Sequence, residues 1–292
     1  MDRTVTVELL IGPRSEEVQL RLRDAVGWQA YADELTALLG AAVRATGAAV
    51  FEVDQLLLNE PVPGDLTWLR NGVTVDPATA VALVVDMAGG KPPPFALVAD
   101  GFRVDTSWDG FVHMGMSEGL AEELGDVDGD EVIVVWRPWD VSRDPVVERV
   151  ADGEFWAEVR AAARARLVLL REQWAHGRLG TRWYLVDAGN VDDVIAGMGR
   201  RSLVGVVVDP DLRLDPTLVE KPFTAFPGPL VPGRLDHVMY GSGVDDVSEV
   251  TGAGLSYMVP DSIVDAWCAV VPDADGVVRI EWEDNHRSIW TR

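Results

Sequence analysis

The chain has 292 residues, 48% of them hydrophobic and 25% charged, a composition that indicates a folded core and excludes a fully disordered chain. Its 48 acidic residues outnumber its 25 basic residues, and the resulting net charge of -23 disfavours nucleic acid and anionic membranes as partners. A single cysteine, Cys268, in an apolar run, excludes an intrachain disulfide and predicts a core thiol.

In the first ninety residues the apolar pattern predicts an opening hairpin followed by two helices. Strands are expected at 4–11 and 18–23, the second because apolar and polar residues alternate. Helical spacing predicts a helix over 28–42, and Asp76-Pro77 is typical of the start of another that ends at Gly89-Gly90. Between the two helices we expect a strand at 50–58 and a tight hairpin across Asn71-Gly72.

The next segment favours short strands. A hairpin is expected around Asp100-Gly101, then a short helix from Ser117 to Leu124 and a strand over 131–136. Residues 137–145 contain two prolines between a strand and a helix, which predicts a boundary between an N-terminal domain, 1–140, and a C-terminal domain, 145–292.

The second half begins with the clearest helical pattern, over 154–176. Strands are expected at 182–186 and 203–208 around a short helix near 192–198, then a proline-rich loop at 222–233 and a final hairpin across Asp275-Gly276. Helices and strands do not alternate regularly. We therefore predict an α+β fold of mixed, mainly antiparallel sheets with three or four packed helices and two subdomains.

No basic, apolar leader and no long apolar run is present, so we expect a cytoplasmic protein that is not embedded in a membrane. No glycine-rich phosphate loop occurs, and we expect no cofactor. The four histidines have no metal-binding spacing. His237 and Ser242 are residue types of a hydrolytic triad, but Ser242 is not in a G-x-S-x-G motif.

Two acidic groups could bind a metal ion. Asp209 and Asp211 follow an apolar strand, and this D-x-D resembles the motif of haloacid-dehalogenase-type phosphatases and of some glycosyltransferases. The resemblance covers about nine residues and implies a metal or nucleophile site, with Asp245 and Asp246 in the place of the later acidic pair; Leu212 and Arg213 stand where the phosphatases have a hydroxyl residue. The alternative is a polar turn at Pro210.

The run GDVDGDE at 125–131 offers oxygen ligands for Ca²⁺ without the remainder of a calcium-binding loop, and we interpret it as a solvated turn. If residues 154–176 continue as a helix, one edge of it carries a row of arginines that could bind an anion or pair with carboxylates of the chain itself. That row consists of Arg160, Arg164, Arg171 and Arg178.

Eleven tryptophans are many for this length, and several stand next to charged residues or turns, as in Trp108-Asp109, Trp136-Arg137 and Trp139-Asp140. An acidic surface with exposed indoles is typical of a protein that binds a basic protein, in the manner of an inhibitor or an immunity protein. We expect this non-enzymatic role. The alternatives are a metal-dependent hydrolase or transferase that uses Asp209 and Asp211, and a structural or scaffold subunit of undetermined oligomeric state.

Overall fold

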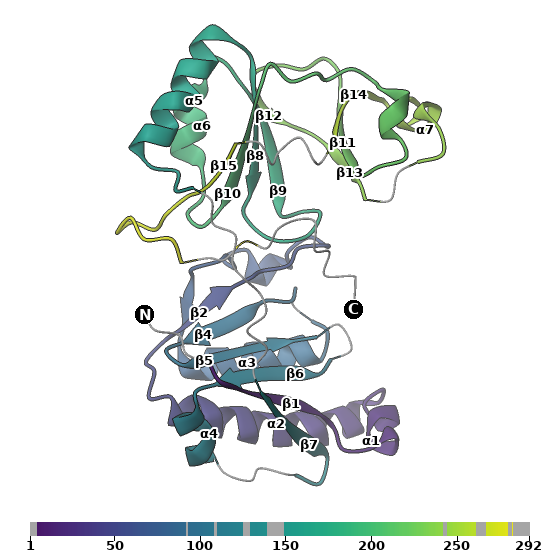
Figure 1. The fold of residues 1–292 in the computed structure, drawn as a ribbon. Coiled ribbons are helices and arrows are strands. Elements are labelled where there is room, and N and C mark those ends of the chain that lie inside the picture. The colour runs from purple at the N-terminus through teal and green to yellow at the C-terminus, as the bar shows by residue number, and fades with distance from the viewer. Residues whose placement is uncertain are drawn as a thin grey trace. The chain divides into compact units, whose positions relative to one another are not determined.

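The computed structural model describes residues 5–91, 93–107, 110–124, 129–138, 149–241, 244–260, 267–279 and 282. About 31% of the chain is helix and 30% is strand, and all of the described strand ladders are antiparallel, so the fold is α+β as predicted. Seven α-helices are described, more than the three or four expected. By its internal contacts the chain divides into two compact units, Met1–Arg143 and Asp144–Arg292 (Figure 1).

The first unit is a seven-stranded antiparallel sheet with helices packed on one face (Figure 1). Its strands, in spatial order, are β3 (Thr74–Val75), β2 (Phe51–Asp54), β4 (Ala96–Ala99), β5 (Phe102–Thr106), β6 (Val112–Met116), β1 (Val7–Pro13) and β7 (Val132–Pro138). Its helices are α1 (Glu16–Arg21), α2 (Ala25–Ala45), α3 (Pro77–Ala88), α4 (Glu118–Leu124) and the 3₁₀ helix η1 (Gly64–Leu66).

The sheet of the first unit has one apolar face and one polar face because side chains alternate along each strand. Leu9 and Ile11 of β1 and Met114 of β6 are fully buried on the apolar face, which the helices cover. The neighbouring residues Glu8 and His113 point to the opposite face.

The strand predicted at 18–23 is wrong, because this segment begins in helix α1. The Ser15 side chain accepts a hydrogen bond from the Val18 N–H at 3.2 Å and caps the helix. A segment of six alternating residues fits a helix of fewer than two turns as well as it fits a strand, and only Val18 of its apolar residues is buried. Strand β1 consequently pairs with β6 and β7, which are distant in sequence.

At Asn71-Gly72 the predicted tight turn is confirmed, because the Val73 N–H donates to the Arg70 carbonyl at 3.2 Å, but the predicted hairpin is wrong. The Asn71 side chain accepts a hydrogen bond from the Leu56 N–H at 2.9 Å, and the two-residue strand β3 pairs with β2. The α3 helix, capped by Asp76, and the β4–β5 hairpin across Asp100-Gly101 are confirmed.

The second unit contains two sheets. The larger has the order β12 (Gly233–Leu235), β9 (Thr181–Val186), β8 (Val168–Gln173), β10 (Leu203–Val208) and β15 (Cys268–Val270). The smaller has the order β13 (Val238–Tyr240), β11 (Phe223–Pro227) and β14 (Leu255–Pro260). The helices are α5 (Gly153–Ala165), α6 (Val191–Gly197), α7 (Val247–Gly252) and the 3₁₀ helix η2 (Pro216–Leu218).

The helices α5 and α6, the larger sheet, the smaller sheet and helix α7 form successive layers (Figure 1). A hydrophobic core lies between each layer and the next. Phe155 and Val159 of α5 pack on one face of the larger sheet. Trp183 on its other face packs against Phe226 of the smaller sheet, with the rings 5.6 Å apart. Val250 of α7 covers the outer face of the smaller sheet.

The long helix predicted over 154–176 is wrong beyond its first half. Helix α5 ends at Ala165, and residues 168–173 form the central strand β8, in which every residue is buried. β8 begins with the apolar run Val168–Leu170, which is buried on both faces of the sheet, and a run this short cannot be told from a helix segment by its spacing.

Candidate interaction surface

Strand β7 holds the one residue of the predicted tryptophan-rich interface that the structure describes, Trp136. Trp108, Asp109, Trp139 and Asp140 lie outside the described residues. Trp136 is 39% exposed and so is its neighbour Val135, although their side chains point to opposite faces of the sheet. Two large apolar side chains are therefore accessible at adjacent positions of one strand.

β7 is the outermost strand of its sheet among the described residues. Among the described strands its neighbour is β1, and the register between them is continuous from Val7 opposite Pro138 to Pro13 opposite Val132. Residues 135–138 are all exposed. This half of the strand therefore has a regular, extended backbone and accessible side chains.

The start of β7 is fixed by Glu34 of α2. The Glu34 carboxylate accepts hydrogen bonds from the backbone N–H groups of Asp130, Glu131 and Val132 at 3.1, 2.9 and 3.1 Å. The Glu131 carboxylate in turn pairs with Arg21 at 3.0 Å. Sequence patterns could not identify this role of Glu34, because its partners lie 96 to 98 residues further along the chain.

The contacts of Glu34 include two residues of the acidic run 125–131, which was considered as a calcium site. Asp130 and Glu131 use backbone groups to hold Glu34, while Asp126 and Asp128 lie outside the described residues. In the part of the chain that the structure describes, no group of three or more histidine, cysteine or acidic side chains is placed to hold a metal ion.

The residues of the D-x-D motif and of its proposed later pair have local contacts. Asp209 follows β10 and pairs with Arg166 at 3.2 Å. Asp211 accepts a hydrogen bond from Arg213 Nε at 2.8 Å, and this bond lowers the pKa of Asp211. Asp246 caps α7 through the Ser248 N–H, which lowers its pKa, and the Asp245 N–H donates to Glu249.

The predicted row of arginines does not form, because the helix expected to carry it ends at Ala165. Arg160 remains on α5 and pairs with Asp192 at 2.7 Å, and Arg164 lies in the last turn of that helix. Arg171 is in strand β8, only 7% exposed, with its guanidinium 5.9 Å from the Trp183 ring centroid. Arg178 lies in the turn before β9.

A buried carboxylate that sequence analysis missed lies at the centre of the second unit. Glu172 of β8 is fully buried and accepts hydrogen bonds from the Gly199 N–H at 2.7 Å, Ser202 Oγ at 3.1 Å and the Tyr184 hydroxyl at 3.2 Å. Arg182 lies 3.4 Å away and stacks over Trp174. The carboxylate oxygens of Glu172 thus have several hydrogen-bond partners, which indicates a structural role for this residue.

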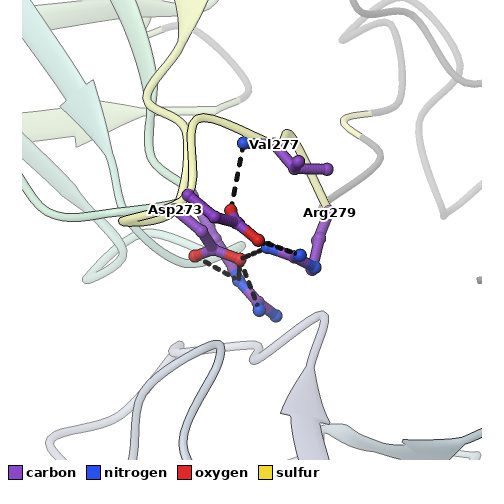
Figure 2. A network of polar contacts seen from close by, with 5 residues as sticks. Asp273, Val277 and Arg279 are labelled. Carbon is purple, nitrogen blue, oxygen red and sulfur yellow. Dashed lines mark hydrogen bonds and ion pairs between the residues drawn. The ribbon is translucent and has the colours of Figure 1, made fainter.

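A second polar cluster ties the segment after β15 to the loop before β10 (Figure 2). Asp273 accepts hydrogen bonds from Arg201 Nη2 and Arg279 Nη1, each at 2.8 Å, and Arg279 also pairs with Asp275. Burial acts to raise the pKa of Asp273, but the hydrogen bonds from both arginines outweigh it and hold the pKa below its ordinary value. The Trp282 indole donates to the Arg201 carbonyl at 3.0 Å.

The polar face of the sheet in the first unit carries a third cluster. His113 Nδ1 lies 2.8 Å from Glu8 Oε1, and Asp105, opposite His113 in the ladder, accepts a hydrogen bond from Arg103 Nε at 3.1 Å. Arg103 also donates to Gln55 at 2.6 Å. The guanidinium is thus already held by the protein's own acceptors.

The first unit also has a shallow hollow of about 520 Å³ between α1, the start of α2 and the end of α3. Leu20, Leu22 and Trp28 form its apolar wall, and Glu16 and Arg23 contribute one charge of each sign. The hollow therefore has no net preference for a basic or an acidic group.

Three further points from the sequence concern His237 and Ser242, Cys268, and the possibility of a membrane-spanning helix. Burial lowers the pKa of His237, and Ser242 lies outside the described residues. Cys268 is partly buried in β15. None of the helices within the described ranges is long and apolar enough to cross a membrane.

Comparison of the chain with protein-family models, with curated proteins and with solved structures gives no match.

Proposed function

We propose that this chain is a non-enzymatic binding protein, inhibitor-like or immunity-protein-like, that engages a basic protein partner. One observation carries the proposal: among the described acidic residues, only Asp54 and Glu172 are buried. The other described carboxylates are at least partly accessible, so the surplus of negative charge lies at the surface, where a partner can meet it.

Several arginine side chains are turned inward and pair with carboxylates of the chain itself, so a partner at the surface does not meet their positive charge. The Arg201 side chain is only 5% exposed and is held by Asp273, and that of Arg103 is 17% exposed between Asp54 and Asp105. Arg182 is 31% exposed beside Glu172. Such a distribution favours attraction of a cationic surface and accelerates its association by electrostatic steering.

The proposal is tested by the salt dependence of association. A basic protein captured by the chain at low salt would be purified, and its association rate constant measured between 50 mM and 500 mM NaCl. Because salt screens charges over about 10 Å at 0.1 M, we expect that rate constant to fall about tenfold or more. A rate constant that does not respond to salt, or capture of neutral and acidic proteins alone, would contradict the proposal.

A charge-neutralised variant provides the structural control. Three exposed carboxylates of α4 would be replaced together, as Glu118→Gln, Glu122→Gln and Glu123→Gln. The matched variant changes three exposed carboxylates of the second unit, as Glu220→Gln, Asp236→Asn and Asp245→Asn. The variant with the slower association shows which unit carries the attraction. If both variants associated as fast as the wild type, this would count against a charge-guided interface.

No contact among the described residues favours either alternative function over this one. Asp209 and Asp211 each pair with an arginine, and neither gathers further carboxylates in the part of the chain that is described. The scaffold alternative would be recognised by light scattering as self-assembly without a partner.

A further inference from the structure

Helix α1, which packs beside the start of α2 (Figure 1), lines the hollow of the first unit with a stripe of exposed side chains. Counted from the first residue, the others follow at three, four and seven positions, the spacing that places side chains on one side of a helix. The stripe consists of Glu16, Gln19, Leu20 and Arg23. It has an acid at one end, a base at the other and Leu20 near its middle.

Both charged ends of this stripe are available to an outside partner. Neither the Glu16 carboxylate nor the Arg23 guanidinium forms a hydrogen bond or an ion pair within the described residues. The neighbouring Arg21, by contrast, is held by Glu131 at 3.0 Å. Leu20 is 54% exposed. The stripe therefore offers two opposite charges and one apolar side chain to the solvent.

The segment around α1 is neutral although the chain as a whole is strongly acidic. Residues 14–24 carry three basic and three acidic side chains, so their formal charges cancel, whereas the whole chain has a net charge of -23. The six residues are Arg14, Arg21, Arg23, Glu16, Glu17 and Asp24. Because surfaces of like charge repel, a second copy of so acidic a chain meets less opposition at a neutral segment than at an acidic one.

We propose that a second copy of this chain docks on the stripe, with the two α1 helices antiparallel about a twofold axis. Glu16 and Arg23 lie equally far along the chain from the midpoint of the stripe, which falls between Gln19 and Leu20. An antiparallel copy therefore brings Glu16 of each chain to Arg23 of the other, and both ion pairs form at once.

The apolar part of the hollow fits the same arrangement. Each Leu20 lies next to the midpoint, so it faces the hollow of the other copy, whose apolar wall is formed by Leu22 and Trp28. Both of these wall residues are partly exposed in the single chain. Contact with Leu20 of the second copy would remove apolar surface from water on both sides.

This inference goes beyond the proposed function and does not depend on it. The α4 carboxylates by which that function is tested do not belong to the stripe, so a basic partner can still meet them in the dimer. A twofold contact uses the same surface on both copies and closes at two copies. It therefore differs from the open assembly of a scaffold.

Sedimentation equilibrium of the full chain tests the dimer. At about 150 mM NaCl charges are screened over about 8 Å, and between about 1 and 300 µM we expect the wild type to change from monomer to dimer. Glu16→Arg places two arginines opposite each other at both ends, and the dissociation constant should rise about tenfold or more. Glu16→Arg combined with Arg23→Glu rebuilds both pairs in reverse and should return it to within about threefold of the wild type.

Two matched controls locate the contact. Glu17→Arg makes the same change of charge in the same turn of α1, but Glu17 does not line the hollow, so the dissociation constant should stay within about twofold of the wild type. Leu20→Asn should raise it about tenfold. Val50→Asn changes a side chain of nearly equal exposure, 52% against 54%, that follows the far end of α2, a helix about 30 Å long, and should leave it unchanged.

Three outcomes would overturn the inference. The first is a chain that stays monomeric at every concentration. The second is a dimer that Glu16→Arg and Glu17→Arg weaken equally, or that the reversed pair does not restore, since the contact would then lie elsewhere. The third is growth to assemblies larger than a dimer, which a closed twofold contact does not allow.

Discussion

At the scale of single residues, two tyrosines with opposite hydrogen-bonding situations give a matched prediction. The Tyr184 hydroxyl donates to the buried Glu172, whereas the Tyr31 hydroxyl is buried without a hydrogen-bond partner among the described residues, and burial raises the pKa of Tyr31 to about 12. We expect Tyr184→Phe to lower the free energy of unfolding by about 1.5–3 kcal/mol, since the bond is to a charged group. Tyr31→Phe should leave that free energy unchanged or raise it.

Urea unfolding of both variants measures the difference directly. A loss of stability in Tyr31→Phe as large as that in Tyr184→Phe would show that the Tyr31 hydroxyl has a partner in solution.

The depressed pKa of Asp273 predicts a pH dependence at the residue scale. A carboxyl whose pKa is lower in the folded state stabilises the protein above its ordinary pKa of 3.8 and loses this contribution as the pH falls towards the folded value. The gap in unfolding free energy between the wild type and Asp273→Asn should therefore be largest at neutral pH and narrow below about pH 4. Urea titrations at pH 7 and pH 3 measure it, and a gap that widens in acid would contradict the assignment.

At the scale of elements, helix α2 contains two glycines whose replacement should have opposite effects. A Cβ atom on Gly27 would lie 2.3 Å from the Arg21 carbonyl oxygen, because the α1–α2 corner brings the two backbones together. A Cβ atom on Gly40 would meet only the end of the Arg44 side chain, at 3.2 Å.

We therefore expect Gly40→Ala to raise the unfolding free energy by about 0.5–1 kcal/mol through helix propensity. Gly27→Ala should lower it by about 1–3 kcal/mol through overpacking. Thermal unfolding of the two variants is the measurement, and stabilisation by both would show that the corner is looser than described.

Elements with local signals were predictable, and those that depend on distant partners were not. Helix α3 has Asp76-Pro77 at its start, and the β4–β5 hairpin has Asp100-Gly101 at its turn, so both could be identified from a few residues. Strand β8 could not be identified from its sequence, because its burial on both faces depends on α5 and on the smaller sheet, which no local window contains.

At the scale of the whole molecule, the net charge of -23 predicts that salt stabilises the fold. Repulsion among surface carboxylates opposes the compact state, and exposed ion pairs, worth about 0–1 kcal/mol each, are too weak to reverse the effect of screening. We expect the urea midpoint at pH 7 to rise between 10 mM and 500 mM NaCl. The rise should disappear near the isoelectric point of about 4.4, and its persistence there would indicate specific ion binding instead.

The division into two units leads to a separate expectation. Each unit has its own buried core, Leu9, Ile11 and Met114 in the first and Phe155, Val159 and Leu170 in the second. We predict that fragments 1–143 and 144–292 fold when expressed alone, which amide hydrogen exchange would show as protection of the same strands as in the full chain. Unprotected fragments would mean that each unit needs the other to fold.

By itself the sequence determined the α+β class, the surplus of negative charge and those elements whose caps and turns lie within a few residues, because composition and local chemistry act without reference to the rest of the chain. Only the tertiary structure decided the strand order, the conversion of the expected long helix into α5 and β8, the capture of β7 by Glu34 and the exposure of Trp136 at a sheet edge. These features arise from residues far apart in the chain, and packing alone brings them together.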